Sequence, residues 1–163
     1  MRQTSTDILI TFVVVLLQTT VARFLAIGGL PPDVVLLWVV YLSIRRGSIT
    51  GTTAGFFAGL AVDLLSGTDG MLGLSALCKT VAGFAAGYFY NENKTQQTLG
   101  SYRFVLIAAF AALLHNLIYF AIFLQGSDIG WWKAVGYYGA PAAAYTAAAA
   151  LIPMFIFARR HPT

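Results

Sequence analysis

Apolar residues fill most of the chain in six segments, and short stretches rich in glycine, proline and polar residues separate them. A helix rises about 1.5 Å per residue, so about 20 residues cross the ~30 Å hydrocarbon core of a bilayer. The pattern therefore predicts one polytopic domain over residues 1–163, a bundle of six transmembrane helices. The expected helices cover residues 8–27, 33–44, 48–65, 71–90, 102–124 and 131–157.

Two of these segments depart from a regular span. The segment at 33–44 is too short to cross a bilayer fully on its own. Pro141 is expected to interrupt the last helix, which nears its end at Pro153.

Composition excludes a soluble fold. Of the 163 residues, 58% are hydrophobic and 10% are charged, whereas a typical soluble domain has about 25% charged residues. A water-soluble domain of this size has too much surface for its volume to hide so many apolar side chains. The sequence therefore indicates an all-α integral membrane protein with the lipid bilayer as its surroundings.

The charge distribution predicts the orientation. The net charge is +4, but the basic residues lie mostly at segment ends, so topology accounts for them and no nucleic-acid partner is expected. With the N-terminus in the cytoplasm, six crossings place nearly all of these basic ends on the cytoplasmic side, and only Lys133 falls in an outer loop. The residues expected inside are Arg2, Arg45, Arg46, Lys94, Arg103, Arg159 and Arg160. Both termini are thus expected in the cytoplasm.

Charged residues inside spans are costly, so each needs an explanation. Four are expected toward the outer half of the bilayer: Arg23, Asp33, Asp63 and Lys79. Because two are acidic and two basic, the set predicts an ion-pair cluster, with a polar cavity for a ligand or partner as the alternative. On this interpretation, removing Asp63 leaves a basic neighbour unpaired.

His115 and Asn116 lie deep in the fifth segment. We expect a hydrogen-bonded core pair, and Gln18 is interpreted in the same way, because no second titratable group is evident at the depth of His115. A proton relay is the alternative. The chain has one cysteine, Cys78, and its two histidines are His115 and His161, so no metal, cofactor or intramolecular disulfide is expected.

Small residues recur every fourth position on two segments, which permits close helix packing in lipid. On the third segment these are Gly47, Gly51, Gly55 and Gly59, followed by Asp63; on the fourth they are Ser75, Lys79, Gly83 and Gly87. We expect both stripes to close the bundle. A contact with a partner protein is the alternative.

The stretch from Gly73 to Ser75 resembles the glycine-x-serine signature of rhomboid-type intramembrane serine proteases. A serine nucleophile needs a histidine base within hydrogen-bond reach. His115 is the only candidate, and it lies on the fifth helix rather than the sixth, where that family keeps its histidine. We therefore expect no catalytic residue.

Four stretches together carry a family resemblance. They are residues 32–37, 40–47, 55–67 and 70–77, and the most specific is Asp63-Leu64-Leu65-Ser66-Gly67 after the glycine stripe. The chain resembles the rod shape-determining protein MreD family of bacteria over residues 8–160. Ser75 is a departure, because family members often carry a histidine near that position.

The resemblance implies a non-enzymatic subunit of the bacterial inner membrane. Such a subunit binds MreC, belongs to the elongation complex with MreB, RodA and the elongation transpeptidase, and helps regulate cell shape and peptidoglycan synthesis. Its fold is similar to the S-components of energy-coupling-factor vitamin transporters. A vitamin-transporter component is therefore an alternative. Those components use small residues four positions apart on the first helix to contact their transporter partner. Ala22 and Ala26 have this spacing, but Arg23 lies between them. Trp38 and Tyr41 are candidates to line the cavity of such a component.

Overall fold

The computed structural model describes residues 2–26, 31–66, 71–125 and 130–160, apart from the side chains of residues 2–4, 23 and 160. Within these ranges every regular element is helical. Among the described residues, three helices are long and apolar enough to cross a membrane: Ser48–Ser66, Tyr102–Phe123 and Trp131–Arg159. Ser5–Thr20 and Leu74–Gly87 are shorter apolar helices. The all-helical membrane fold is thus confirmed, whereas six crossings remain a prediction.

The elements follow the predicted segments with several shifted bounds. In chain order they are α1 (Arg2–Thr20), the 3-10 helix η1 (Ala22–Leu25), α2 (Val34–Arg46), α3 (Ser48–Ser66), α4 (Leu74–Gly87), α5 (Thr95–Leu99), α6 (Tyr102–Phe123), α7 (Trp131–Ala134), the π-helix η2 (Val135–Gly139), α8 (Ala140–Ala149) and α9 (Leu151–Arg160). The first helix begins earlier than expected and its α-helical part ends at Thr20, while residues 27–30 lie outside the described part. The polar stretch 91–101 contains α5, which the sequence did not predict.

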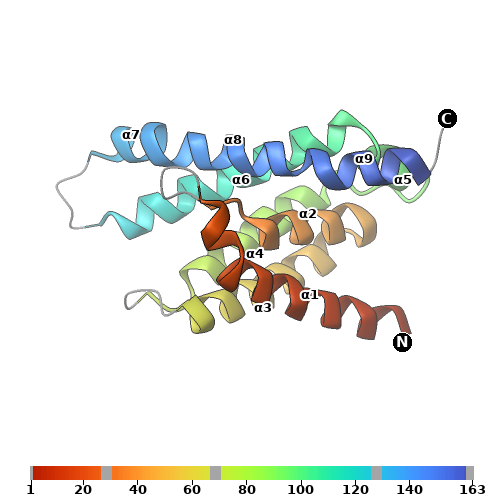
Figure 1. Ribbon diagram of the computed structural model, residues 1–163, viewed down its shortest axis with the longest axis horizontal. Coiled ribbons are helices and arrows are strands. Elements are labelled where there is room, and N and C mark those ends of the chain that lie inside the picture. The colour runs from red at the N-terminus through yellow and green to blue at the C-terminus, as the bar shows by residue number, and fades with distance from the viewer. Residues whose placement is uncertain (1, 27–30, 67–70, 126–129, 161–163) are drawn as a thin grey trace.

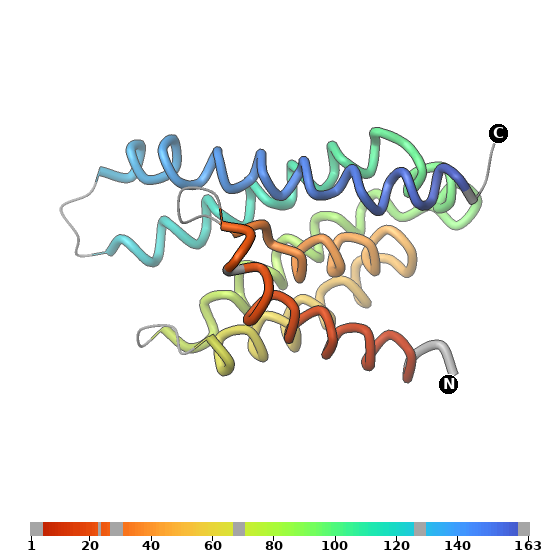
Figure 2. Tube along the Cα trace, in the orientation of Figure 1, coloured from red at the N-terminus to blue at the C-terminus, as the bar shows by residue number. Residues whose placement is uncertain are grey.

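The helices form three layers (Figure 1). α2 and α4 lie in the middle, with α1 and α3 on one side and α6 and α8 on the other. Figure 2 shows α7 to α9 as one continuous rod that runs antiparallel to α6. The start of α1, the end of α9 and α5 lie at the same end of the bundle (Figure 1).

The central helix α2 is short because its surroundings are protein. Its 13 residues rise about 20 Å, less than the ~30 Å of hydrocarbon. Val35, Val39, Val40 and Ile44 are fully buried, so α2 carries apolar side chains on nearly all sides, as a helix in the centre of a bundle must. Its N-terminus, at Asp33, therefore ends inside the bundle.

The two small-residue stripes meet at the contact between α3 and α4. A Cβ atom on Gly51 would lie 2.6 Å from the Gly83 carbonyl oxygen, and one on Gly59 would lie 2.5 Å from the Ala76 Cα. A Cβ on Gly87 would lie 2.5 Å from the Ser48 nitrogen. Such distances leave no room for a side chain, so the structure places these glycines at a helix-packing contact within the chain.

Two prolines shape the last rod. Pro141 lies in the first turn of α8, directly after the π-helix, and it has no N–H to bond to the preceding turn. Pro153 likewise frees the carbonyl of Ala149, where α8 ends and α9 begins at Leu151. The helix nevertheless continues to Arg160. The sequence placed its last residue at 157, with Pro153 near its end, so the predicted helix was too short.

Candidate functional site

Asp33 begins α2 and anchors it to the last rod. Its Oδ1 atom accepts a hydrogen bond from the backbone N–H of Leu36 at 2.8 Å, which satisfies one of the free donors at the helix N-terminus. Its own N–H donates to the Thr146 hydroxyl of α8 at 3.1 Å. The Oδ1 atom and the backbone N–H of Asp33 thus both have defined partners.

Lys79 of α4 forms an ion pair with Asp33. The distance from Lys79 Nζ to Asp33 Oδ2 is 2.7 Å, and Lys79 is only 3% exposed. Each charge would be very costly in this position alone, and the opposite charge with its hydrogen bonds offsets that cost. The pair therefore depends on both members.

His115 of α6 extends the network beyond the ion pair. Its Nε2 lies 3.3 Å from Lys79 Nζ, and its Nδ1 lies 3.3 Å from the Asn116 Oδ1. A protonated lysine has no lone pair, so Nε2 must accept from Lys79, and the ring proton belongs on Nδ1, which donates to Asn116. The Asn116 amide then donates to the Gly139 carbonyl of the π-helix at 2.9 Å. The hydrogen bonds run in one direction from Lys79 to the last rod.

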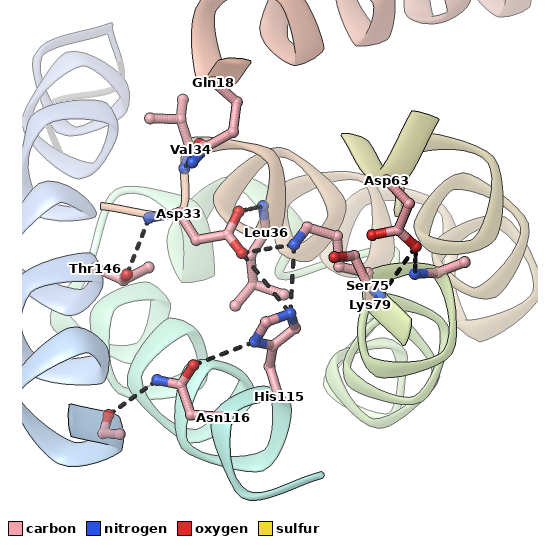
Figure 3. A network of polar contacts seen from close by, with 12 residues as sticks. Gln18, Asp33, Val34, Leu36, Asp63, Ser75, Lys79, His115, Asn116 and Thr146 are labelled. Atoms are coloured by element: carbon pink, nitrogen blue, oxygen red, sulfur yellow. Dashed lines mark hydrogen bonds and ion pairs between the residues drawn. The ribbon is translucent and has the colours of Figure 1, made fainter. Parts of the chain in front are cut away.

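The network connects helices from all three layers (Figure 3). Gln18 of α1 accepts a hydrogen bond from the Val34 N–H at 2.8 Å, which ties α1 to the start of α2. Asp33, Lys79, His115 and Thr146 then connect α2, α4, α6 and α8. One polar cluster, defined here as Gln18, Asp33, Lys79, His115, Asn116 and Thr146, thus joins five α-helices and the π-helix.

Asp63 has a different role from the expected one. Its buried Oδ2 accepts N–H groups of the α4 N-terminus, at 2.9 Å from Gly73 and 3.1 Å from Ser75, with Ala76 at 3.4 Å. These are the free donors of a helix start, where a negative charge is also favoured by the helix dipole. Asp63 of α3 therefore caps α4 from a neighbouring helix, and Lys79 pairs with Asp33.

The structure thus brings together only part of the set expected from the sequence. Asp33 and Lys79 meet, Asp63 lies at the cap of α4, and the side chain of Arg23 is outside the described part. The expectation that no titratable group shares the depth of His115 was wrong, because Lys79 contacts it. Counting residues along the helices would have indicated this proximity. Lys79 lies five residues after the start of α4, and His115 lies eight residues before the end of α6. These positions are about 8 and 12 Å from the end of the bundle where α4 starts and α6 ends.

Among the described residues, the geometry does not build a serine–histidine dyad. Both ring nitrogens of His115 face other groups, Lys79 and Asn116, so the base that Ser75 would need is engaged elsewhere. Trp38 and Tyr41, candidates for a vitamin cavity, line a groove that reaches Arg45 and Arg46 at the end of α2. We call this end of the bundle the basic end. In the described part of the chain no group of three metal-ligating side chains occurs.

The fold and the polar cluster define a class: an all-helical membrane protein whose interior helices are connected by one buried ion pair and its hydrogen bonds. The chain belongs to the MreD family. The family model described as "rod shape-determining protein MreD" matches residues 2–160, essentially the whole chain, which confirms the resemblance and makes this a rod shape-determining membrane protein. No curated protein and no solved structure matches the chain, so the likeness to energy-coupling-factor S-components stays a prediction.

Proposed function

We propose that this protein is a non-catalytic inner-membrane subunit of the bacterial cell-elongation complex and that it binds MreC within the bilayer. The observation that carries the proposal is the family match over residues 2–160. The chain offers its partners almost nothing but helices, since the described segments between helices are short. A partner contact is therefore expected on apolar helix surface, inside the membrane.

The proposed topology has six crossings with both termini in the cytoplasm. Two observations support it. The start of α1 and the end of α9 lie at one end of the bundle (Figure 1), and the elements or turns at that end carry Arg45, Arg46, Lys94, Arg103 and Arg159. A cytoplasmic excess of lysine and arginine is the usual orientation signal.

The polar cluster has a positioning role in this proposal. Its donors and acceptors are directed at one another across five helices, an arrangement that fixes helix register rather than activates a nucleophile. A rigid bundle would present a constant surface to MreC. Through MreC, the subunit would reach MreB, RodA and the elongation transpeptidase and influence peptidoglycan synthesis.

Co-purification tests the proposal. The protein is co-expressed with full-length MreC and, as a matched control, with MreC whose single membrane span is replaced by an unrelated one. We expect capture of native MreC only, and altered cell width when the gene is deleted. Equal capture of both forms would contradict contact within the bilayer. No capture together with unchanged cell width would contradict the proposed function.

A further inference from the structure

A large cavity lies between α1, α2 and the α8–α9 rod. Its volume is about 980 Å³, and most of its lining is apolar, including Val14, Leu37 and Ile152. That volume is at the upper end of the range for ligand sites. α1 and α9 make at most sparse contact, and α2 lies between them in Figure 1. The cavity is therefore expected to open between α1 and α9, toward the surrounding lipid.

The length of the cavity matches one leaflet. Its lining on α2 extends from Val34 to Arg46, which corresponds to about 18 Å of helix rise. A membrane-spanning helix would need about 30 Å, whereas the acyl chains of one lipid occupy about half of that thickness. The cavity is therefore too short for a crossing helix and long enough for acyl chains.

One end of the cavity is bordered by a contact between η1 and α8. The Tyr145 hydroxyl of α8 donates a hydrogen bond to the Leu25 carbonyl at 2.7 Å, and both residues line the cavity together with Pro32. This contact joins the 3-10 helix after α1 to the last rod. The Tyr145–Leu25 contact thus borders the groove at the end opposite Arg45.

The other end carries positive charge. Arg45 and Arg46 line it, with Asp7 of α1. Asp7 forms an ion pair with Arg46, whereas Arg45 donates to the Tyr41 hydroxyl at 3.1 Å and, among the described residues, has no carboxylate partner. One unit of positive charge is therefore left over at the mouth, where an anionic group would be favoured.

Stacked aromatic rings form a flat wall beside that charge. Tyr41 stacks on Trp38 at 5.1 Å and on Phe157 of α9 at 5.4 Å between ring centroids. Trp38 is also held by α1, because its Nε1 donates to the Thr11 hydroxyl at 2.8 Å. The wall is therefore fixed in place and offers apolar area to extended chains.

We propose that this groove binds one anionic diacyl phospholipid from the leaflet at the basic end, with its acyl chains between α1 and α9 and its phosphate at Arg45. The proposed topology makes this the cytoplasmic leaflet. Lipid binding in this groove is separate from MreC binding and does not require it. An experiment can therefore contradict one of the two proposals and leave the other standing.

Native mass spectrometry of the full chain, released from bilayers of phosphatidylglycerol and phosphatidylethanolamine, tests the proposal. We expect one retained phosphatidylglycerol per chain. R45Q is expected to weaken its retention about five-fold, as for loss of one basic residue near a membrane surface. R103Q is the matched control, because Arg103 is an exposed basic residue outside the groove.

A second pair of variants tests the groove itself. A148W places a bulky ring in the lining, whereas A144W places it on an exposed position of the same helix outside the lining. We expect lipid loss from A148W only. Unchanged retention in R45Q and A148W, equal retention of phosphatidylethanolamine, or a polyprenyl phosphate as the retained lipid would overturn the proposal. So would displacement of one lipid for each MreC bound, which would assign the groove to the partner.

Discussion

At the residue scale, the buried charges of Asp33 and Lys79 are the most consequential feature. A 2.7 Å ion pair inside a bundle stabilises only while both members are present, because a single remaining charge is largely shielded from water and has lost its counter-ion. His115 and the Leu36 N–H add hydrogen bonds to the charged groups, which the pair needs because an isolated ion pair rarely offsets its own desolvation.

Replacing Lys79 alone is therefore expected to be severe. K79M leaves the mostly buried Asp33 carboxylate without its lysine partner, at an expected cost of about 3–5 kcal/mol in the free energy of unfolding. The double variant D33N/K79M removes both charges and keeps an asparagine as helix cap, so it should be more stable than K79M. Thermal unfolding in one detergent, followed by tryptophan fluorescence, measures both. Wild-type stability of K79M would contradict the role of the pair.

Asp63 gives a contrasting prediction, because it caps a helix. An asparagine at this position keeps an oxygen acceptor for the N–H groups of Gly73 and Ser75, whereas alanine does not. We expect D63A to cost about 1–2 kcal/mol and D63N a few tenths.

The same unfolding measurement compares the two Asp63 variants. If the negative charge itself were required, as the sequence-based ion-pair cluster implied, D63N would be as damaging as D63A. That outcome would contradict the capping role.

Sequence reasoning identified most of these residues but not their pairing. Asp33, Asp63 and Lys79 were recognisable because charges in apolar segments are rare. Which carboxylate meets Lys79 depends on how α2, α3 and α4 are rotated about their axes. His115 was underestimated for the same reason: its depth could be counted along α6, but its facing direction could not.

At the element scale, α3 and α4 are joined by backbone contact rather than by large side chains. Lipid gives apolar helices no hydrophobic reason to associate, so close packing supplies the attraction. The four-residue spacing of glycine on both helices is the sequence signal for this contact. Only the structure shows that the stripes face each other and leave no glycine face for a partner there.

A single methyl group should disturb the α3–α4 contact. A Cβ on Gly55 would lie 2.7 Å from the Lys79 carbonyl carbon, so G55A must push α4 away and shift Lys79, at an expected cost of about 1–3 kcal/mol. G136A is the matched control, because a Cβ on Gly136 meets nothing within 4 Å. Detergent melts of both variants provide the comparison, and equal stability would refute the tight contact.

At the scale of the whole molecule, the bundle has two distinct ends. The basic turns, α5, the start of α1 and the end of α9 lie together, while the polar cluster lies toward the opposite end, at the start of α2 (Figure 1). The proposed lipid groove extends from the basic end to the Tyr145–Leu25 contact. Inside a membrane, this polarity would hold the bundle at one depth and orientation.

Cysteine labelling in spheroplasts tests that orientation. A membrane-impermeant maleimide should label G130C from outside and R103C only after permeabilisation, since Gly130 and Arg103 are exposed at opposite ends of the bundle. The native Cys78 is fully buried and should give no background. The reverse pattern would invert the topology. Labelling of both sites from outside would contradict the single crossing by α6 that separates Arg103 from Gly130.

By itself, the sequence determined that the chain is helical, that it belongs in a membrane and that it is a member of the MreD family, because composition, segment length and local motifs require no knowledge of neighbours. Tertiary structure alone decided which charges pair, that Asp63 caps α4, and that a groove opens beside α2. Those features depend on helix rotation and separation, which are set by contacts between segments far apart in the chain. Hydropathy specifies where a helix lies in a bilayer, but not which of its faces meets which neighbour.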